Sequence, residues 1–129
     1  CILKQAPDAI FIPHPNDANP AHSAMYKMVR ACLTQHALAV SLFKQMDPKT
    51  TGMRIDCFTP VSADDVAWKT QLLSHHKTQD HRNIVTRGIT LAERVLQSNT
   101  ATAQAHHLPC KMAEAFEIEN FSNASDLTE

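Results

Sequence analysis

The stretch that decides the fold is residues 20–46, PAHSAMYKMVRACLTQHALAVSLFKQM, which lies between Asn19 and Asp47-Pro48. Asn19 before Pro20 is typical of a helix start, because asparagine caps the first turn and proline fits the first helical position. Mostly apolar side chains then recur at three- and four-residue spacing along one stripe without a breaker. This stripe consists of Met25, Met28, Val29, Cys32, His36, Ala39, Val40, Phe43 and Met46. The spacing predicts a single helix across the whole stretch.

Further helices are expected after a turn at 49–52 and a short extended segment at 53–58. Ser62 followed by Asp65 is an imperfect capping pair, because glutamate or glutamine is usual at the second position. Helical spacing from 63 to 97, with a polar middle, predicts two helices or one bent helix. Ser98-Asn99-Thr100 is a natural stop, and Pro109 is expected in the first turn of a last helix that carries Met112, Ala115 and Phe116.

The N-terminal segment carries Pro7, Pro13 and Pro15, which favour extended backbone over helix. Its apolar run at 9–12 is expected to lie in a groove between helices, and docking on a partner is the alternative. The fold predicted from these patterns is all-α: a four- to five-helix bundle in a single helical domain of residues 1–129. Within it, 1–19 would be an extended arm, 20–121 the helical bundle and 122–129 a frayed tail.

Glycine is scarce: the chain has two glycines in 129 residues, Gly52 and Gly88, whereas average usage would give about nine. Phosphate-binding loops, dinucleotide fingerprints and nucleophile elbows depend on glycine, so enzymes that use these motifs are disfavoured. A net charge of −1 and 43% hydrophobic residues give no case for a disordered or nucleic-acid-coating protein. No apolar run is long enough to cross a bilayer.

Four cysteines, Cys1, Cys32, Cys57 and Cys110, allow two disulfides in any of three pairings, and a structural role is favoured for them. Asn120 and Asn123 each begin an Asn-x-Ser sequon, the acceptor for N-glycosylation. Both features favour a secreted protein, and a cytoplasmic protein with reduced cysteines is the alternative.

The chain has eight histidines, and some lie at ligand-like spacing. His76 and Asp80 are four residues apart, so on a helix they share a face and can share a metal ion. His106 or His107, from a helix packed alongside, would complete a tetrahedral set for zinc or iron, and Cys110 is a further candidate. The alternative is that these histidines are solvated surface residues.

The sequence therefore predicts a non-catalytic binding protein that engages a protein partner or a small apolar ligand, with no nucleic-acid partner and no membrane span. One alternative is an intracellular helical interaction domain excised from a larger protein. Another is a His-ligated metal-binding bundle. Catalysis without a metal ranks last, because the sequence places no acid, base and nucleophile together.

Overall fold

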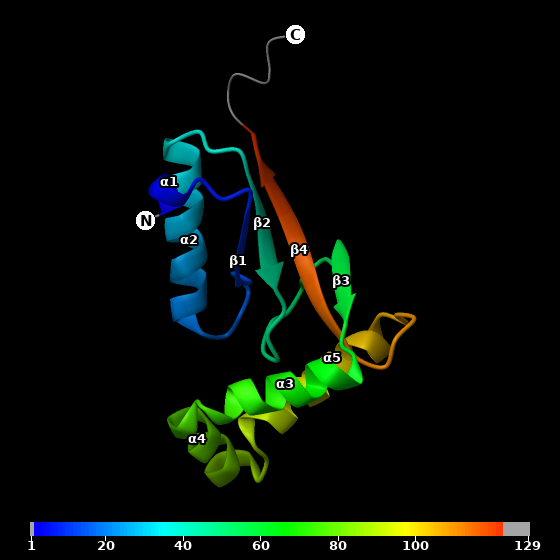
Figure 1. Ribbon diagram of the computed structural model, residues 1–129. Helices are drawn as coiled ribbons and strands as arrows, with labels where there is room; N and C mark the ends of the chain where they lie inside the picture. Colours follow the sequence, from blue (N-terminus) through cyan, green and yellow to red (C-terminus); the bar gives the residue numbers. More distant parts are fainter. Residues whose placement is uncertain (1, 123–129) are drawn as a thin grey trace. The chain divides into compact units, whose positions relative to one another are not determined.

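The computed structural model describes residues 2–122 of the chain (Figure 1). Its helices are α1 (Ile2–Gln5), α2 (Pro20–Gln35), α3 (Ala63–Ser74), α4 (Lys77–Arg87) and α5 (Leu91–Ala105). Its strands are β1 (Ala9–Pro13), β2 (Val40–Gln45), β3 (Cys57–Pro60) and β4 (Ala113–Phe121), and they form one mixed sheet in the order β1-β2-β4-β3. The all-α prediction is therefore wrong, and the fold is mixed α/β.

By its internal contacts the chain divides into two compact units. Unit 1 comprises residues 1–57 and 115–129, and unit 2 comprises residues 58–114. The single domain expected from the length stays a prediction that unfolding measurements would test. The predicted tail falls mostly on residues 123–129, which lie outside the described residues.

Unit 1 is built on a β-α-β motif in which α2 connects two parallel strands. β1 pairs with β2 from Ala9 opposite Ser41 to Pro13 opposite Gln45. β4 pairs with the other edge of β2 in antiparallel fashion, from Val40 opposite Phe121 to Gln45 opposite Phe116. The segment 9–12, expected as part of an arm, is thus a strand of the sheet.

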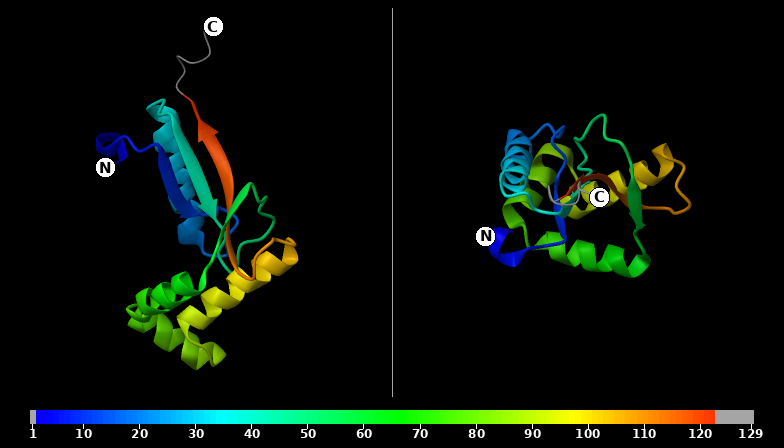
Figure 2. Two further views of the ribbon diagram at one scale, coloured as in Figure 1. Left: turned by 45° about the vertical axis from the view of Figure 1, so that its right-hand side comes forward. Right: turned by 90° about the horizontal axis from the view of Figure 1, so that it is seen from above.

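Helix α2 packs against one face of this sheet (Figure 2). Leu33 on the helix and Leu42 on β2 are fully buried there, and Ile12 and Val40 are nearly so. Burial of one leucine side chain contributes about 1.5–3 kcal/mol. The opposite face carries an aromatic group in which Phe11 stacks on Phe43 with ring centroids 4.8 Å apart.

The stretch 20–46 contains a helix and a strand, so the prediction of one continuous helix is wrong after Gln35. Its start is confirmed: Asn19 caps α2 by accepting a hydrogen bond from the backbone N–H of Ala21, and Pro20 is the first helical residue. The helix ends because Ala37 takes a left-handed conformation, with φ of 47°. The N–H groups of Ala37 and Leu38 then bond to the carbonyls of Thr34 and Leu33, which is a Schellman motif.

Unit 2 contains α3, α4 and α5, and α5 contacts both of the other helices. Ser62 and Asp65 form a complete capping box at α3, which confirms the predicted helix start there. Thr90 and Glu93 form another at α5. Helix α5 continues through Asn99, whose buried side chain donates to the carbonyl of Ala113, so the predicted stop at 98–100 is wrong.

The predicted last helix after Pro109 is also wrong, because residues 113–121 form β4. In this strand alternate side chains face α2 and the opposite face of the sheet, and residues 116–121 lie in register with β2. The other backbone edge of β4 bonds to Asp56, which donates to the Phe116 carbonyl and accepts from the Ile118 N–H. The same apolar positions fit a helical stripe, so spacing alone did not separate the two structures.

Candidate functional site

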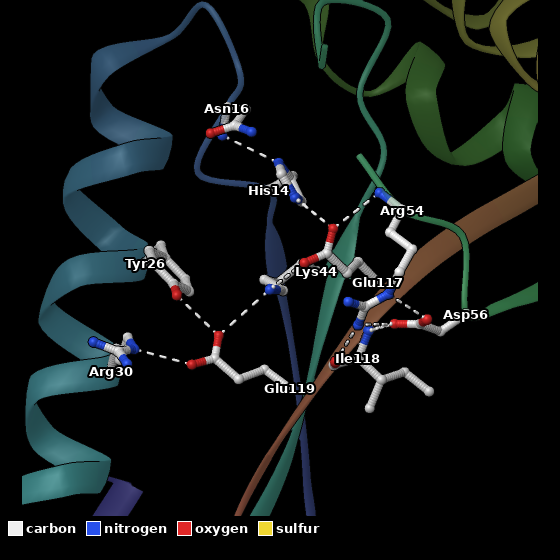
Figure 3. Close-up of polar contacts among 10 residues, drawn as sticks. All are labelled: His14, Asn16, Tyr26, Arg30, Lys44, Arg54, Asp56, Glu117, Ile118 and Glu119. Carbon is white, nitrogen blue, oxygen red and sulfur yellow. Dashed lines mark hydrogen bonds and ion pairs between the residues drawn. The ribbon is translucent and has the colours of Figure 1, made fainter. Parts of the chain in front are cut away.

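A polar cluster of unit 1 lies between α2 and the sheet (Figure 3). Its core is Lys44 on β2 with Glu117 and Glu119 on β4. The register places Lys44 opposite Glu117 and Leu42 opposite Glu119, and the two-residue period of a strand turns these side chains toward α2. Three further residues reach this core, and together we call the six residues the Lys44 cluster. They are His14, Tyr26, Arg30, Lys44, Glu117 and Glu119.

Glu117 accepts from three donors. The Lys44 Nζ lies 2.7 Å from its Oε1, while the Arg54 backbone N–H and the His14 Nε2 lie 3.0 and 3.3 Å from its Oε2. Burial by itself would raise the pKa of Glu117, but the bonds from Lys44 and Arg54 outweigh it and lower that pKa. Glu117 is therefore held as a carboxylate.

Glu119 is held in the same way from the helix side. Arg30 Nε lies 2.9 Å from its Oε1, and the Tyr26 hydroxyl donates to its Oε2 over 2.8 Å. Lys44 Nζ is a further donor to Oε2 at 3.4 Å. Burial is again outweighed, so the pKa of Glu119 is lowered, and burial beside this carboxylate raises the pKa of Tyr26.

Lys44 is the buried cation of the cluster, with a side chain only 8% exposed. Burial would lower its pKa, but the bonds and charges of Glu117 and Glu119 raise it. A buried ammonium is tolerated only when it is paired in this way.

The imidazole of His14 is also buried, and its hydrogen bonds fix its tautomer. Its Nδ1 accepts from the backbone N–H of Asn16 over 3.1 Å, so the proton lies on Nε2, the atom that faces Glu117.

Next to the cluster, Arg54 forms a forked pair with Asp56, at 2.6 Å from Nε to Oδ1 and 2.7 Å from Nη2 to Oδ2. Asp56 also accepts from the backbone N–H of Ile118. The Arg54 guanidinium and this N–H lower the pKa of Asp56 to about 2. The pair fastens the segment before β3 to β4.

All four carboxylate oxygens of Glu117 and Glu119 have donors within the protein. Hydrogen bonds and nearby charges lower the pKa of both carboxylates, which makes them weak bases, and Lys44 is engaged by both. The arrangement therefore ties α2, β2 and β4 together. Sequence reasoning missed it, although the two-residue spacing of Glu117 and Glu119 was a signal for a strand with one charged face.

A second polar group lies in the loops that follow β1 and β2. The Asp17 side chain is 1% exposed and lies 3.4 Å from His22 Nδ1. Burial would raise the pKa of Asp17, but hydrogen bonds from the Asn19 backbone and with the Asp47 side chain, and the nearby His22, lower it. Asp17 and Thr50 also form an isolated β-bridge, so the group joins the two loops.

The residues predicted as metal ligands lie at helix ends in unit 2. His76 directly precedes α4 and its side chain makes no capping bond, Asp80 in the first turn of α4 accepts from the Leu91 N–H, and His106 and His107 follow the end of α5. Within residues 2–122, no three or more histidine, cysteine, aspartate or glutamate side chains are grouped so as to hold a metal ion. The structure thus does not assemble the predicted zinc or iron set, which stays a prediction.

The disulfide prediction is corrected for the three described cysteines, because Cys32, Cys57 and Cys110 are free thiols. Cys32 lies on α2, Cys57 begins β3, and Cys110 follows α5. The prediction rested on the number of cysteines, which does not determine whether the fold brings any two of them together. Cys1 lies outside the described residues.

Of the two sequons, Asn120 is exposed on β4, where its Oδ1 accepts from the Ser41 hydroxyl over 2.9 Å. Asn123 lies outside the described residues. Glycosylation at both positions stays a prediction.

Large apolar side chains are exposed on both units. In unit 2 they are Trp68 and Leu72 on α3 and Ile84 and Val85 on α4, and in unit 1 they are Phe11 on β1 and Met25 and Met28 on α2. Trp68 is 62% exposed and Val85 70%. Such side chains are more informative when several share a surface than when they are scattered.

Among the described helices, none combines the length and the apolar character that a membrane span requires. Comparison of the chain with protein families, with curated proteins and with solved structures found no match in any of the three.

Proposed function

We propose that this chain is a non-catalytic interaction protein that binds a protein partner through the exposed apolar face of α3. The observation that carries the proposal is the exposure of Trp68 and Leu72, which are 62% and 45% exposed. They are four residues apart, so they lie on the same face of the helix. Tryptophan is enriched among the residues that dominate binding energy at protein interfaces.

The surroundings of this face suit a protein partner. Asp64 and Asp65 lie in the first turn of α3, so acidic groups border the apolar pair. A polar rim around an apolar centre is the usual anatomy of a protein interface. The internal pairing of the Lys44 cluster also supports a binding role over a catalytic one.

Binding can be followed directly, because Trp68 is the only tryptophan of the chain. Proteins retained by the immobilised chain would be identified, purified and titrated against it while Trp68 emission is recorded. We expect a blue shift on binding, and we expect loss of retention in the double variant W68S/L72S. The matched control is Thr70→Ser, an exposed position on another side of the same helix. A partner that binds W68S/L72S as tightly as the wild type would refute the proposal.

A small apolar ligand is the second candidate, because a groove runs along α5. Leu96, Ala101 and Met112 line it, with Glu93 and Gln104 also contributing. If this groove binds the ligand, substitution of Leu96 with glutamine should weaken binding of a fluorescent fatty-acid probe, whereas W68S/L72S should leave the affinity for the probe unchanged. Secretion stays a prediction, because the α3 face and the α5 groove would both suit an extracellular or an intracellular protein.

A further inference from the structure

Strand β1 is at the edge of the sheet, and its hydrogen bonds to β2 define which of its residues face outward. The Asp8 carbonyl accepts from the Ser41 N–H over 2.9 Å, and the His14 N–H donates to the Gln45 carbonyl over 3.1 Å. Backbone groups alternate sides along a strand, so the even-numbered residues of β1 bond to β2. The odd-numbered residues therefore direct their N–H and C=O groups away from the sheet.

This outer edge offers few donors. The outward residues are Pro7, Ala9, Phe11 and Pro13, and proline has no N–H. Ala9 and Phe11 are thus the two outward donors of the segment, framed by a proline on each side. Among the described residues no strand pairs with this edge.

The flank of α2 on the same side of the unit is apolar and exposed. Arg30 reaches across to Glu119 on β4, so the opposite flank of the helix lies on the β1 side. With about 100° of rotation per residue, that flank holds Ala21, Met25, Met28 and Cys32. Met25 is 45% exposed and Met28 72%.

We propose that a second copy of this chain binds this edge, with the two β1 strands antiparallel and centred on Ile10. In this register Ala9 of each copy lies opposite Phe11 of the other. Each such pair exchanges two N–H···O=C bonds, so all four outward donors are satisfied. Pro7 and Pro13 lie opposite each other outside the ladder, and they prevent its extension. This inference concerns unit 1 and goes beyond the binding face proposed on α3.

The absence of charge on the β1-side flank of α2 is compatible with a second copy at this edge. Two copies joined in one continuous antiparallel sheet are related by a two-fold axis perpendicular to the sheet, so both α2 helices cover the same face. Their β1-side flanks then approach each other, and a charged flank would repel its own copy. Positions 21, 25, 28 and 32 carry no charge, whereas the flank toward β4 carries Lys27 and Arg30. Met25 and Met28 would be covered in the dimer.

The test combines sedimentation velocity with amide hydrogen exchange over a dilution series of the full chain. We expect a concentration-dependent dimer in which the amides of Ala9 and Phe11 exchange slowly, and fast exchange of both when the protein is diluted. Met28→Glu places like charges on the two facing flanks, which should weaken the dimer by about tenfold or more. Ala31→Glu puts the same charge on an exposed position of the far side of α2 and should leave the dimer intact.

Ala9→Pro is a second variant, because it removes one outward donor from each copy and leaves the bonds of Asp8 and Ile10 to β2 in place. Far-ultraviolet dichroism would show that each variant is folded. A chain that stays monomeric at its solubility limit overturns the inference, and so does a dimer in which Ala9 and Phe11 exchange freely or which Ala31→Glu alone disrupts. W68S/L72S should leave the dimer unchanged, so failure of the α3 proposal is separable from failure of this one.

Discussion

Replacing Lys44 with methionine should destabilise unit 1, because it removes the buried cation and keeps most of the side-chain stem. Loss of one partner from a buried ion pair costs about 3–5 kcal/mol. Glu117 and Glu119 keep other donors, and their side chains are 17% and 23% exposed. We therefore expect the lower end, about 3 kcal/mol, which is a large share of the roughly 5–15 kcal/mol of a typical domain.

The loss should depend on pH with a defined sign. Glu117 and Glu119 have folded pKa values below the ordinary 4.5, so their contribution is present above that pH and is lost as pH falls through the lowered values. Lys44 has a folded pKa above 10.5, so its contribution is present below pH 10.5 and is lost as pH rises through the raised value. The difference in unfolding free energy between wild type and Lys44→Met should therefore be full between these limits and shrink as the pH falls through the lowered pKa values of the two carboxyls.

The free energy of unfolding would be measured in urea. The chain has one tyrosine and one tryptophan, whose fluorescence follows the transition. Tyr26, its only tyrosine, reports on unit 1, and Trp68 reports on unit 2. Lys27→Met on the exposed surface of α2 is the control and should change the unfolding free energy by less than about 0.5 kcal/mol. The double variant K44M/E117Q should recover part of the loss. A deficit below about 1 kcal/mol at pH 7, or a deficit that does not shrink as the pH falls below 4.5, would contradict the stabilising role of the cluster.

Three further predictions concern single residues. Ala37→Gly should raise the unfolding free energy by about 1 kcal/mol in urea, because glycine adopts the left-handed conformation without the strain of a Cβ, and an unchanged or lower stability would refute this. Ser62→Ala should cost about 1 kcal/mol by removing the cap of α3, with Ser62→Thr as the conservative control and Trp68 emission as the probe. The carboxyl of Asp56 should titrate near pH 2 by NMR and move toward its ordinary 3.8 in Arg54→Ala; a value already ordinary in the wild type would be incompatible with the Arg54 pair.

Local signals located helix starts and extended backbone near β1 and β3, but not the sheet or the strands β2 and β4. Asn19-Pro20 and Ser62 with Asp65 act within one turn, so the sequence predicts them and the structure confirms both. Val40 and Phe43 fit a helical stripe as well as a strand, and pairing with β1 and β4 decides between the two. That pairing joins residues far apart along the chain, which a spacing pattern does not represent.

The scarcity of glycine was also a weaker constraint than expected. It disfavoured glycine-rich loops, but turns formed without glycine: Ala6, Ala37 and His107 adopt positive φ. The Lys44 cluster could not be predicted from the sequence, because its members come together only through strand pairing. Lys44 and Glu117 are 73 positions apart, so only the register of β2 with β4 brings them together.

Unit 1 is built from two segments that are separated in the sequence by unit 2, and this affects how the protein folds during synthesis. β1, α2 and β2 leave the ribosome well before β4, and all of unit 2 is made in between. Until translation reaches Glu117 and Glu119, the ammonium of Lys44 lacks the two carboxylates that pair with it in the folded protein. The edge of β2 that later pairs with β4 also remains open to other nascent chains. The contiguous unit 2 can complete its folding first, so maturation of this protein should run from its middle outward.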